Sequence, residues 1–83
     1  PWRMLWYQFG PYQAYYESGN YNEVVNLANT TLSNATNLEE SYYWRGMALA
    51  AMGRPDEARR DFQQAVRLNP NFAPAHEGLA TLQ

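Results

Sequence analysis

Few residues in this sequence have the types and spacing that chemistry requires: one histidine, two pairs of adjacent acids and no cysteine. A catalytic histidine needs a nucleophile and an orienting carboxylate within hydrogen-bonding reach, and a zinc site needs three or four ligands. His76 has no such set of partners. The pairs Glu39-Glu40 and Asp56-Glu57 are chain neighbours, so on a helix their side chains point about 100° apart and cannot face one substrate bond. We therefore expect no catalytic, metal or cofactor site, and no enzymatic activity.

The charged residues also argue against nucleic acid as a partner. Six basic and eight acidic side chains give a net charge of −2, which exerts no long-range attraction on phosphate backbones. Arg59, Arg60 and Arg67 could form a basic stripe for RNA, but Asp56 lies four residues before Arg60 and Asp61 interrupts the run. No run of about 18 apolar residues occurs, so we expect no membrane insertion either.

An internal repeat organises the elements that would have to position a site. Comparing the sequence with itself finds an offset of 34 residues. Each of two glycines is followed, four residues later, by a glutamate that enters an amphipathic stretch. The aligned identities are Ala14 with Ala48, Gly19 with Gly53, Glu23 with Glu57 and Asn37 with Asn71. A period of this length is typical of helical repeat proteins.

Local signals predict helices and no strands. Gly19 and Gly53 fit the residue just after a helix, Pro55 fits the first position of the next one, and Asn69-Pro70 ends it. The predicted spans are 11–18, 21–33, 39–52, 55–68 and 73–82. These make short antiparallel helical hairpins, an all-α fold.

Caps and apolar stripes support these spans. Asn20 with Glu23, and Asn37 with Glu40, have the spacing of capping boxes at the starts of the second and third helices. Apolar residues recur on one face of the second and fourth helices, where we expect burial. They are Val24, Leu27, Ala28, Thr31 and Leu32, and then Ala58, Phe62, Ala65 and Val66.

The segment from Tyr42-Tyr43-Trp44-Arg45-Gly46 through Pro55-Asp56-Glu57-Ala58 and Phe62 to Leu68-Asn69-Pro70 resembles the tetratricopeptide repeat. The resemblance implies hairpins stacked as an α-α superhelix, with about two and a half repeats. It also implies a close helix approach at Gly46, facing Ala58 and Ala65. Departures from the family pattern are Arg45, at a usually apolar place, and in the first repeat Tyr12, Val24 and Thr36.

We expect two regions: an amino-terminal aromatic segment over 1–10 that continues from an upstream region, and a repeat domain over 11–83. The repeats would cover about 5–38 and 39–72, and 73–83 would be the opening helix of a third. Tryptophans and other aromatics concentrate in the first half, more than two helices can bury. We therefore expect residues 2–16 to form a contact surface, through which the chain could form a homo-oligomer.

The resemblance implies that the first helix of each repeat lines a groove for a partner segment. Carried over position by position, the groove residues are Trp6, Phe9, Gln13, Tyr16, Glu17, Glu40, Tyr43, Trp44 and Met47. An alternative is that Trp6, Phe9 and Tyr43 pack against a neighbouring domain or a second copy. Many family members hold a terminal carboxylate with lysines and asparagines at certain groove positions. The corresponding positions here are Phe9, Gln13 and Trp44, and the sequence has no lysine.

The sequence thus favours a protein-protein interaction module that binds a peptide or protein partner, or another domain of its own polypeptide. The alternative is a carboxy-terminal structural appendage docked on the catalytic domain of a larger bacterial, peptidase-like enzyme. The sequence assigns no compartment.

Overall fold

The computed structural model describes residues 12–34 and 38–82 of the chain. In these ranges the backbone is helical, with a short helical segment at 12–17 followed by α2 (Tyr21–Ser33), α3 (Leu38–Ala51), α4 (Pro55–Leu68) and α5 (Ala73–Thr81). The predicted spans agree with these bounds to within a residue at each described end. The all-α prediction is confirmed.

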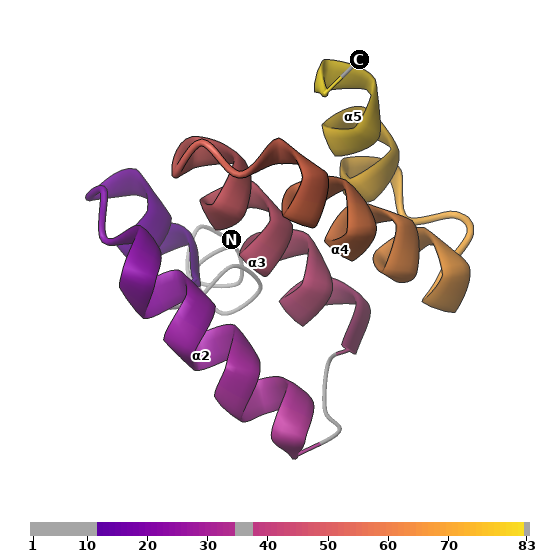
Figure 1. The fold of residues 1–83 in the computed structure, drawn as a ribbon. Coiled ribbons are helices and arrows are strands. Elements are labelled where there is room, and N and C mark those ends of the chain that lie inside the picture. Colours follow the sequence, from indigo (N-terminus) through magenta and orange to yellow (C-terminus); the bar gives the residue numbers. More distant parts are fainter. Residues whose placement is uncertain (1–11, 35–37, 83) are drawn as a thin grey trace, which may run out of the picture.

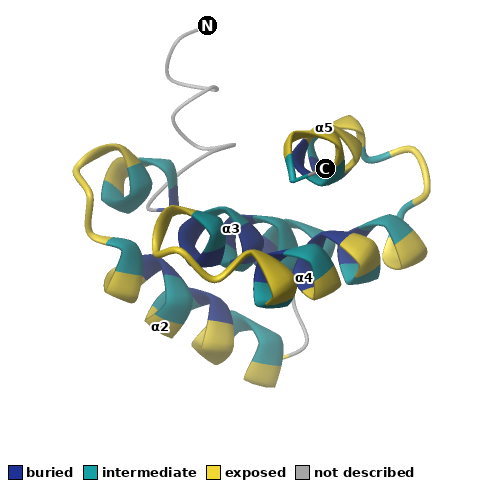
Figure 2. Ribbon diagram, turned by 45° about the horizontal axis from the view of Figure 1, so that its top comes forward, coloured by how far each residue is buried: buried dark blue, intermediate teal, exposed yellow. Residues whose placement is uncertain are grey.

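Two layers of helices make up the described part of the chain. Figure 2 shows α3 in the middle, with segment 12–17 and α5 to either side of it, while α2 and α4 run along the other face. In Figure 1, α2, α3 and α4 lie side by side in chain order. The helix α3 packs mainly against α4 and α2, so it is the central element.

The turns between helices depend on two glycines with positive φ, Gly19 at 82° and Gly53 at 80°. At the first turn the Gly19 amide donates to the Tyr16 carbonyl at 3.1 Å, and the Asn20 amide donates to the Tyr15 carbonyl at 2.8 Å. This pair of bonds is the Schellman pattern, which satisfies the last carbonyls of a helix and requires a left-handed residue. The glycines therefore end the helices as expected.

The predicted capping box at Asn20 is wrong. Asn20 is the N-cap residue of α2, but its side chain makes no capping hydrogen bond. Its Nδ2 instead donates to Ser18 Oγ at 3.0 Å. The reason is that Asn20 also belongs to the preceding turn, which holds its ψ at 64° rather than in the extended range of most N-cap residues. Asn37, the other predicted cap, lies outside the described residues.

The ring of Phe62 fixes the packing of α3, α4 and α5. Phe62 is 1% exposed, and its ring lies against two helical glycines. A Cβ atom built on Gly46 would lie 2.9 Å from Phe62 Cε1 and 3.2 Å from the Ala58 carbonyl oxygen, and one built on Gly78 would lie 2.7 Å from Phe62 Cζ. Such distances leave no room for a side chain, which confirms the close approach expected at Gly46.

In the first repeat the large and the small residue are exchanged between the two helices of the hairpin. Tyr12 stands 34 residues before Gly46, and Ala28 stands 34 residues before Phe62. Tyr12 and Ala28 are both buried, at 6% and 0% exposure, and pack in one cluster with Trp44. The large ring thus comes from the first helix of the hairpin instead of the second, which accounts for Tyr12 departing from the family pattern.

A hydroxyl chain links this cluster to its neighbours. Thr31 Oγ1 donates to the Leu27 carbonyl at 2.8 Å and accepts from the Tyr12 hydroxyl at 3.1 Å. That leaves Ser41 Oγ, at 3.0 Å, as the donor to Tyr12. Ser41 is fully buried, so its hydroxyl needs this partner.

The buried stripes are largely as predicted. Val24 and Ala28 of α2, and Ala58, Phe62 and Ala65 of α4, are buried. Leu27, Thr31, Leu32 and Val66 are half-buried. One buried residue of α4 was not predicted: Asp61, a charged residue that is only 5% exposed.

Replacing Gly46 with leucine should lower the free energy of unfolding by about 1 to 3 kcal/mol or more, because the added atoms meet Phe62 and the backbone of α4. The matched control is Ala51→Leu, at an exposed position of the same helix, which should change stability by less than about 0.5 kcal/mol. Chemical denaturation of the variants measures both values. Equal stability of the two would contradict the packing described.

Replacing Tyr12 with phenylalanine should destabilise the fold by about 1 to 3 kcal/mol, because it leaves the buried Ser41 hydroxyl without its acceptor. Adding Ser41→Ala to that variant should cost little or restore part of the loss. A double-mutant cycle measured by denaturation gives the coupling between the two residues. Strictly additive effects would show that the hydroxyls do not interact.

Candidate partner-binding groove

Aromatic side chains of α3 and of the turn before α5 gather around Tyr43. The Tyr43 ring is the centre of this group: its centroid lies 5.1 Å from that of Trp44 and 5.7 Å from that of Phe72, both in edge-to-face geometry. On its inner side Tyr43 also contacts Phe62 at 5.9 Å. The core ring of Phe62 therefore contacts Tyr43 from the interior of the fold.

A cavity of about 210 Å³ opens beside these rings. Its lining residues come from segment 12–17, from α3 and from the start of α5: Gln13, Glu40, Tyr43, Trp44, Phe72 and Pro74. The first helices of successive hairpins thus meet at this cavity. Its volume is below the range of about 300–1,000 Å³ usual for small-molecule pockets, so it suits one large side chain.

The structure brings together Gln13, Glu40, Tyr43 and Trp44 of the predicted groove residues. Tyr16 and Met47 are half-buried, pack against the core as Tyr43 does, and do not line this cavity. Glu17 is exposed, and its carboxylate accepts a hydrogen bond from Gln13 Nε2 at 2.8 Å. Trp6 and Phe9 lie outside the described residues, as does most of the segment 2–16 expected to form an oligomer contact.

Two lining residues were not predicted, Phe72 and Pro74. They belong to the turn and first residues of α5, where Phe72 is the N-cap and Pro74 stands in the first turn. The prediction considered only positions within the first helices, so a turn residue escaped it. The aromatic residue after Asn69-Pro70-Asn71 was the available signal.

Comparison with known proteins identifies this arrangement. Residues 39–72 match the family model described as the tetratricopeptide repeat. The chain contains a tetratricopeptide repeat. The repeat comprises α3, α4 and the turn that leads to α5, and it supplies most of the cavity.

Curated relatives carry the same kind of repeat in their names. The chain is 39% identical over 67 residues to the TPR repeat-containing thioredoxin TTL4 of Arabidopsis thaliana. The aligned region covers 81% of this chain and 10% of that protein. The chain is also 39% identical over 56 residues to the tetratricopeptide repeat and J domain-containing co-chaperone DNJ1 of Cryptococcus neoformans, covering 68% of this chain and 9% of the relative.

A third relative is the DnaJ homolog subfamily C member 7 of Mus musculus, at 36% identity over 63 residues, with 76% of this chain and 13% of the relative covered. The chain therefore spans about a tenth of the length of the relatives that it matches. No solved structure matches the chain at a significant level.

Tetratricopeptide repeats generally mediate protein-protein interactions. In this groove, burial and charge shift the pKa values of two residues. Glu40 is half-buried, and burial raises the pKa of its carboxyl, with the nearby Glu39 charge raising it further. Burial likewise raises the pKa of the Tyr43 hydroxyl, helped by Tyr16 and by the charge of Glu77. The cavity thus has one half-buried carboxylate, that of Glu40, in its lining.

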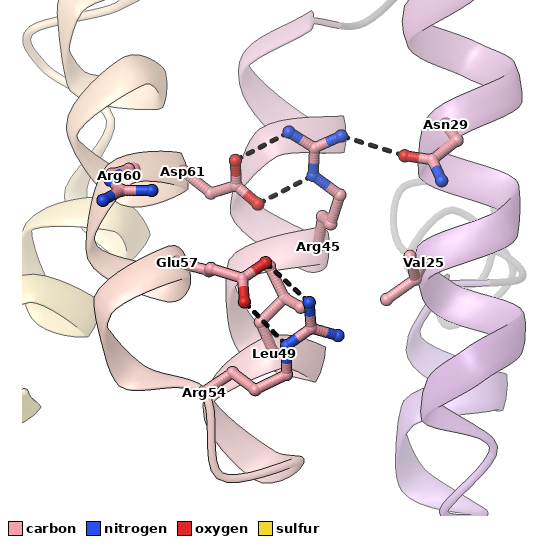
Figure 3. Close-up of a pocket in the computed structure, with 8 residues that line it drawn as sticks. All are labelled: Val25, Asn29, Arg45, Leu49, Arg54, Glu57, Arg60 and Asp61. Carbon is pink, nitrogen blue, oxygen red and sulfur yellow. Dashed lines mark hydrogen bonds and ion pairs between the residues drawn. The ribbon is translucent and has the colours of Figure 1, made fainter.

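The opposite face of the repeat carries a larger hollow of about 450 Å³ between α2, α3 and α4 (Figure 3). Two of its three arginines pair with its two carboxylates. Arg45 donates two hydrogen bonds of 2.8 Å to the Asp61 carboxylate and one of 2.9 Å to Asn29 Oδ1, and Arg54 pairs with Glu57 at 2.7 Å. The hydrogen bond with Asp61 raises the pKa of Arg45 above its usual value.

This network explains Arg45 at a usually apolar position of the repeat. Its side chain, 25% exposed, joins α3 to Asp61 of α4 and to Asn29 of α2, and so ties the first repeat to the second. Bidentate pairing compensates the buried Asp61 charge. The Arg45–Asp61 pair at this hollow therefore holds the helices together.

His76 shows no catalytic constellation. It is exposed, and its Nε2 lies 2.7 Å from the Pro70 carbonyl oxygen, to which only a protonated nitrogen can donate. In the described part of the chain, no three or more His, Cys, Asp or Glu side chains form a group that could hold a metal ion. None of the helices described is both long and apolar enough to cross a lipid bilayer.

Replacing Glu39 with glutamine should lower the pKa of Glu40, because it removes the like charge that opposes ionisation of the Glu40 carboxyl. A pH titration of the Glu40 carboxyl carbon by NMR measures this value. In the wild-type chain the raised pKa means that the folded state binds this proton more tightly than the unfolded state. The Glu40 contribution to stability therefore falls as pH rises from the ordinary pKa through the raised one. An unchanged or higher Glu40 pKa in the variant would contradict this assignment.

Proposed function

We propose that this chain is a protein-interaction module that binds a segment of a partner protein in the aromatic cavity between segment 12–17, α3 and α5. The observation that carries the proposal is the cavity itself. Two half-buried aromatic residues, Tyr43 and Phe72, and the buried Trp44 line it, and its lining comes from the first helices of successive hairpins. Aromatic side chains in concave sites are where binding energy concentrates in interfaces.

The repeat is not itself catalytic in this proposal. Its scaffold holds the aromatic side chains in place. Phe62 contacts Tyr43 from the core, and Tyr12 stacks on Trp44 with a centroid distance of 6.2 Å. Side chains held in this way lose little further entropy on binding. The names of the co-chaperone and thioredoxin relatives place such repeats in multidomain proteins, which is compatible with a partner segment on another chain or on the same one.

The experiment is a selection of peptides from a random displayed library on the 83-residue chain, followed by calorimetric measurement of the affinity of those enriched. Replacing Phe72 with alanine should weaken their binding by at least about tenfold, because Phe72 forms a wall of the cavity. Circular dichroism and thermal melting confirm that this variant remains folded.

The matched control is Arg60→Ala, an exposed residue that lines the hollow on the opposite face. It should leave the affinity of the same peptides unchanged. Failure to enrich any peptide whose binding depends on Phe72 would overturn the proposal. It would favour the alternative, in which the repeat serves as a structural appendage of a larger enzyme.

A further inference from the structure

We infer that the cavity accepts the side chain of an arginine, presented by a basic segment of the partner. The inference rests on the proposed function and specifies the chemistry of its ligand. Three independent features of the groove support it: the sign of the surrounding charge, the type of hydrogen-bonding group that lines the cavity, and the nature of its walls.

The charge around the cavity is negative. Glu40 lines it, and three further glutamates are linked to its lining residues: Glu17 accepts a hydrogen bond from Gln13, Glu39 raises the pKa of Glu40, and Glu77 raises that of Tyr43. Of the described residues on 12–17, α3 and α5, Arg45 alone is a lysine or arginine.

The arginines of the described chain are engaged elsewhere. The guanidinium of Arg45 is bound to Asp61 and Asn29 on the opposite face, and the other described arginines lie on α4 or at its N-cap. Among the described residues, the groove therefore carries negative charge without a paired arginine, which attracts a cationic partner and repels an acidic one.

Two of the polar side chains in the cavity wall, Glu40 and Gln13, offer oxygens that can accept hydrogen bonds from a cation. The Glu40 carboxylate offers two oxygens, and Gln13, which donates one N–H of its Nε2 to Glu17, offers its amide oxygen. A guanidinium carries five N–H donors and no acceptor, so it matches this lining. An apolar side chain in the same place would remove water from the Glu40 carboxylate and give it no counter-charge.

The walls favour arginine over other cations. Tyr43, Trp44 and Phe72 line the cavity. The rings of Trp44 and Phe72 each stand roughly perpendicular to the ring of Tyr43. A planar guanidinium stacks on aromatic faces and pairs with a carboxylate in bidentate fashion at the same time, whereas a lysine ammonium remains a strongly hydrated point charge.

The test is an NMR titration of the chain with N-acetyl-arginine amide, compared with N-acetyl-citrulline amide, which has nearly the same shape and no charge. We expect saturable shifts of the Trp44 indole and Gln13 amide signals at millimolar arginine. The citrulline probe should bind at least about fivefold more weakly. The Glu40 carboxyl carbon should report a lower pKa when arginine is bound, because a cation favours the ionised carboxylate.

Glu40→Gln and its matched control Glu39→Gln separate a specific pair from general attraction, since both remove one negative charge from the first turn of α3. Glu40→Gln should abolish the preference for arginine over citrulline, and Glu39→Gln should retain it. Equal binding of the two probes, or equal loss in the two variants, would overturn the inference. Library peptides that depend on Phe72 but contain no preferred arginine would overturn the inference alone and leave the proposed function intact.

Discussion

The whole arrangement depends on the close approach of the Phe62 ring to Gly46 and Gly78. Because neither glycine has a side chain, the ring contacts α3 and α5 at once and holds both against α4. The position of α5 in turn brings Phe72 and Pro74 beside α3, where they complete the cavity. A packing constraint in the core thus determines the shape of a surface site.

Most of the fold could be predicted because its signals are local. A glycine that must take a positive φ, a proline at a helix start and an asparagine-proline pair at a helix end each act on their own residue, so the spans of α2 and α4 could be placed correctly. The burial of Asp61 could not. An apolar stripe at Ala58, Phe62 and Ala65 says nothing of a charge beside it, and the partner that compensates this charge, Arg45, comes from another helix.

The candidate site was predictable only in part, and for a similar reason. Resemblance to the family indicated Gln13, Glu40, Tyr43 and Trp44 because each stands within a first helix. The same reasoning included Tyr16 and Met47, which do not line the cavity. Phe72 reaches the cavity from a turn, where no helical periodicity applies, so only the three-dimensional packing reveals it.

The exchange of ring and small residue between the two repeats has a consequence for how such a chain can be recombined. In the first repeat the ring belongs to Tyr12 and the small residue is Ala28, whereas in the second the small residue is Gly46 and the ring belongs to Phe62. A hairpin made of the Tyr12 helix and α4 would place the rings of Tyr12 and Phe62 at the same position. A hairpin made of α3 and α2 would place Gly46 opposite Ala28, with no ring at that position. The smallest segment that can be duplicated, deleted or grafted without repacking is therefore a complete hairpin. A single helix of one hairpin cannot replace the corresponding helix of the other.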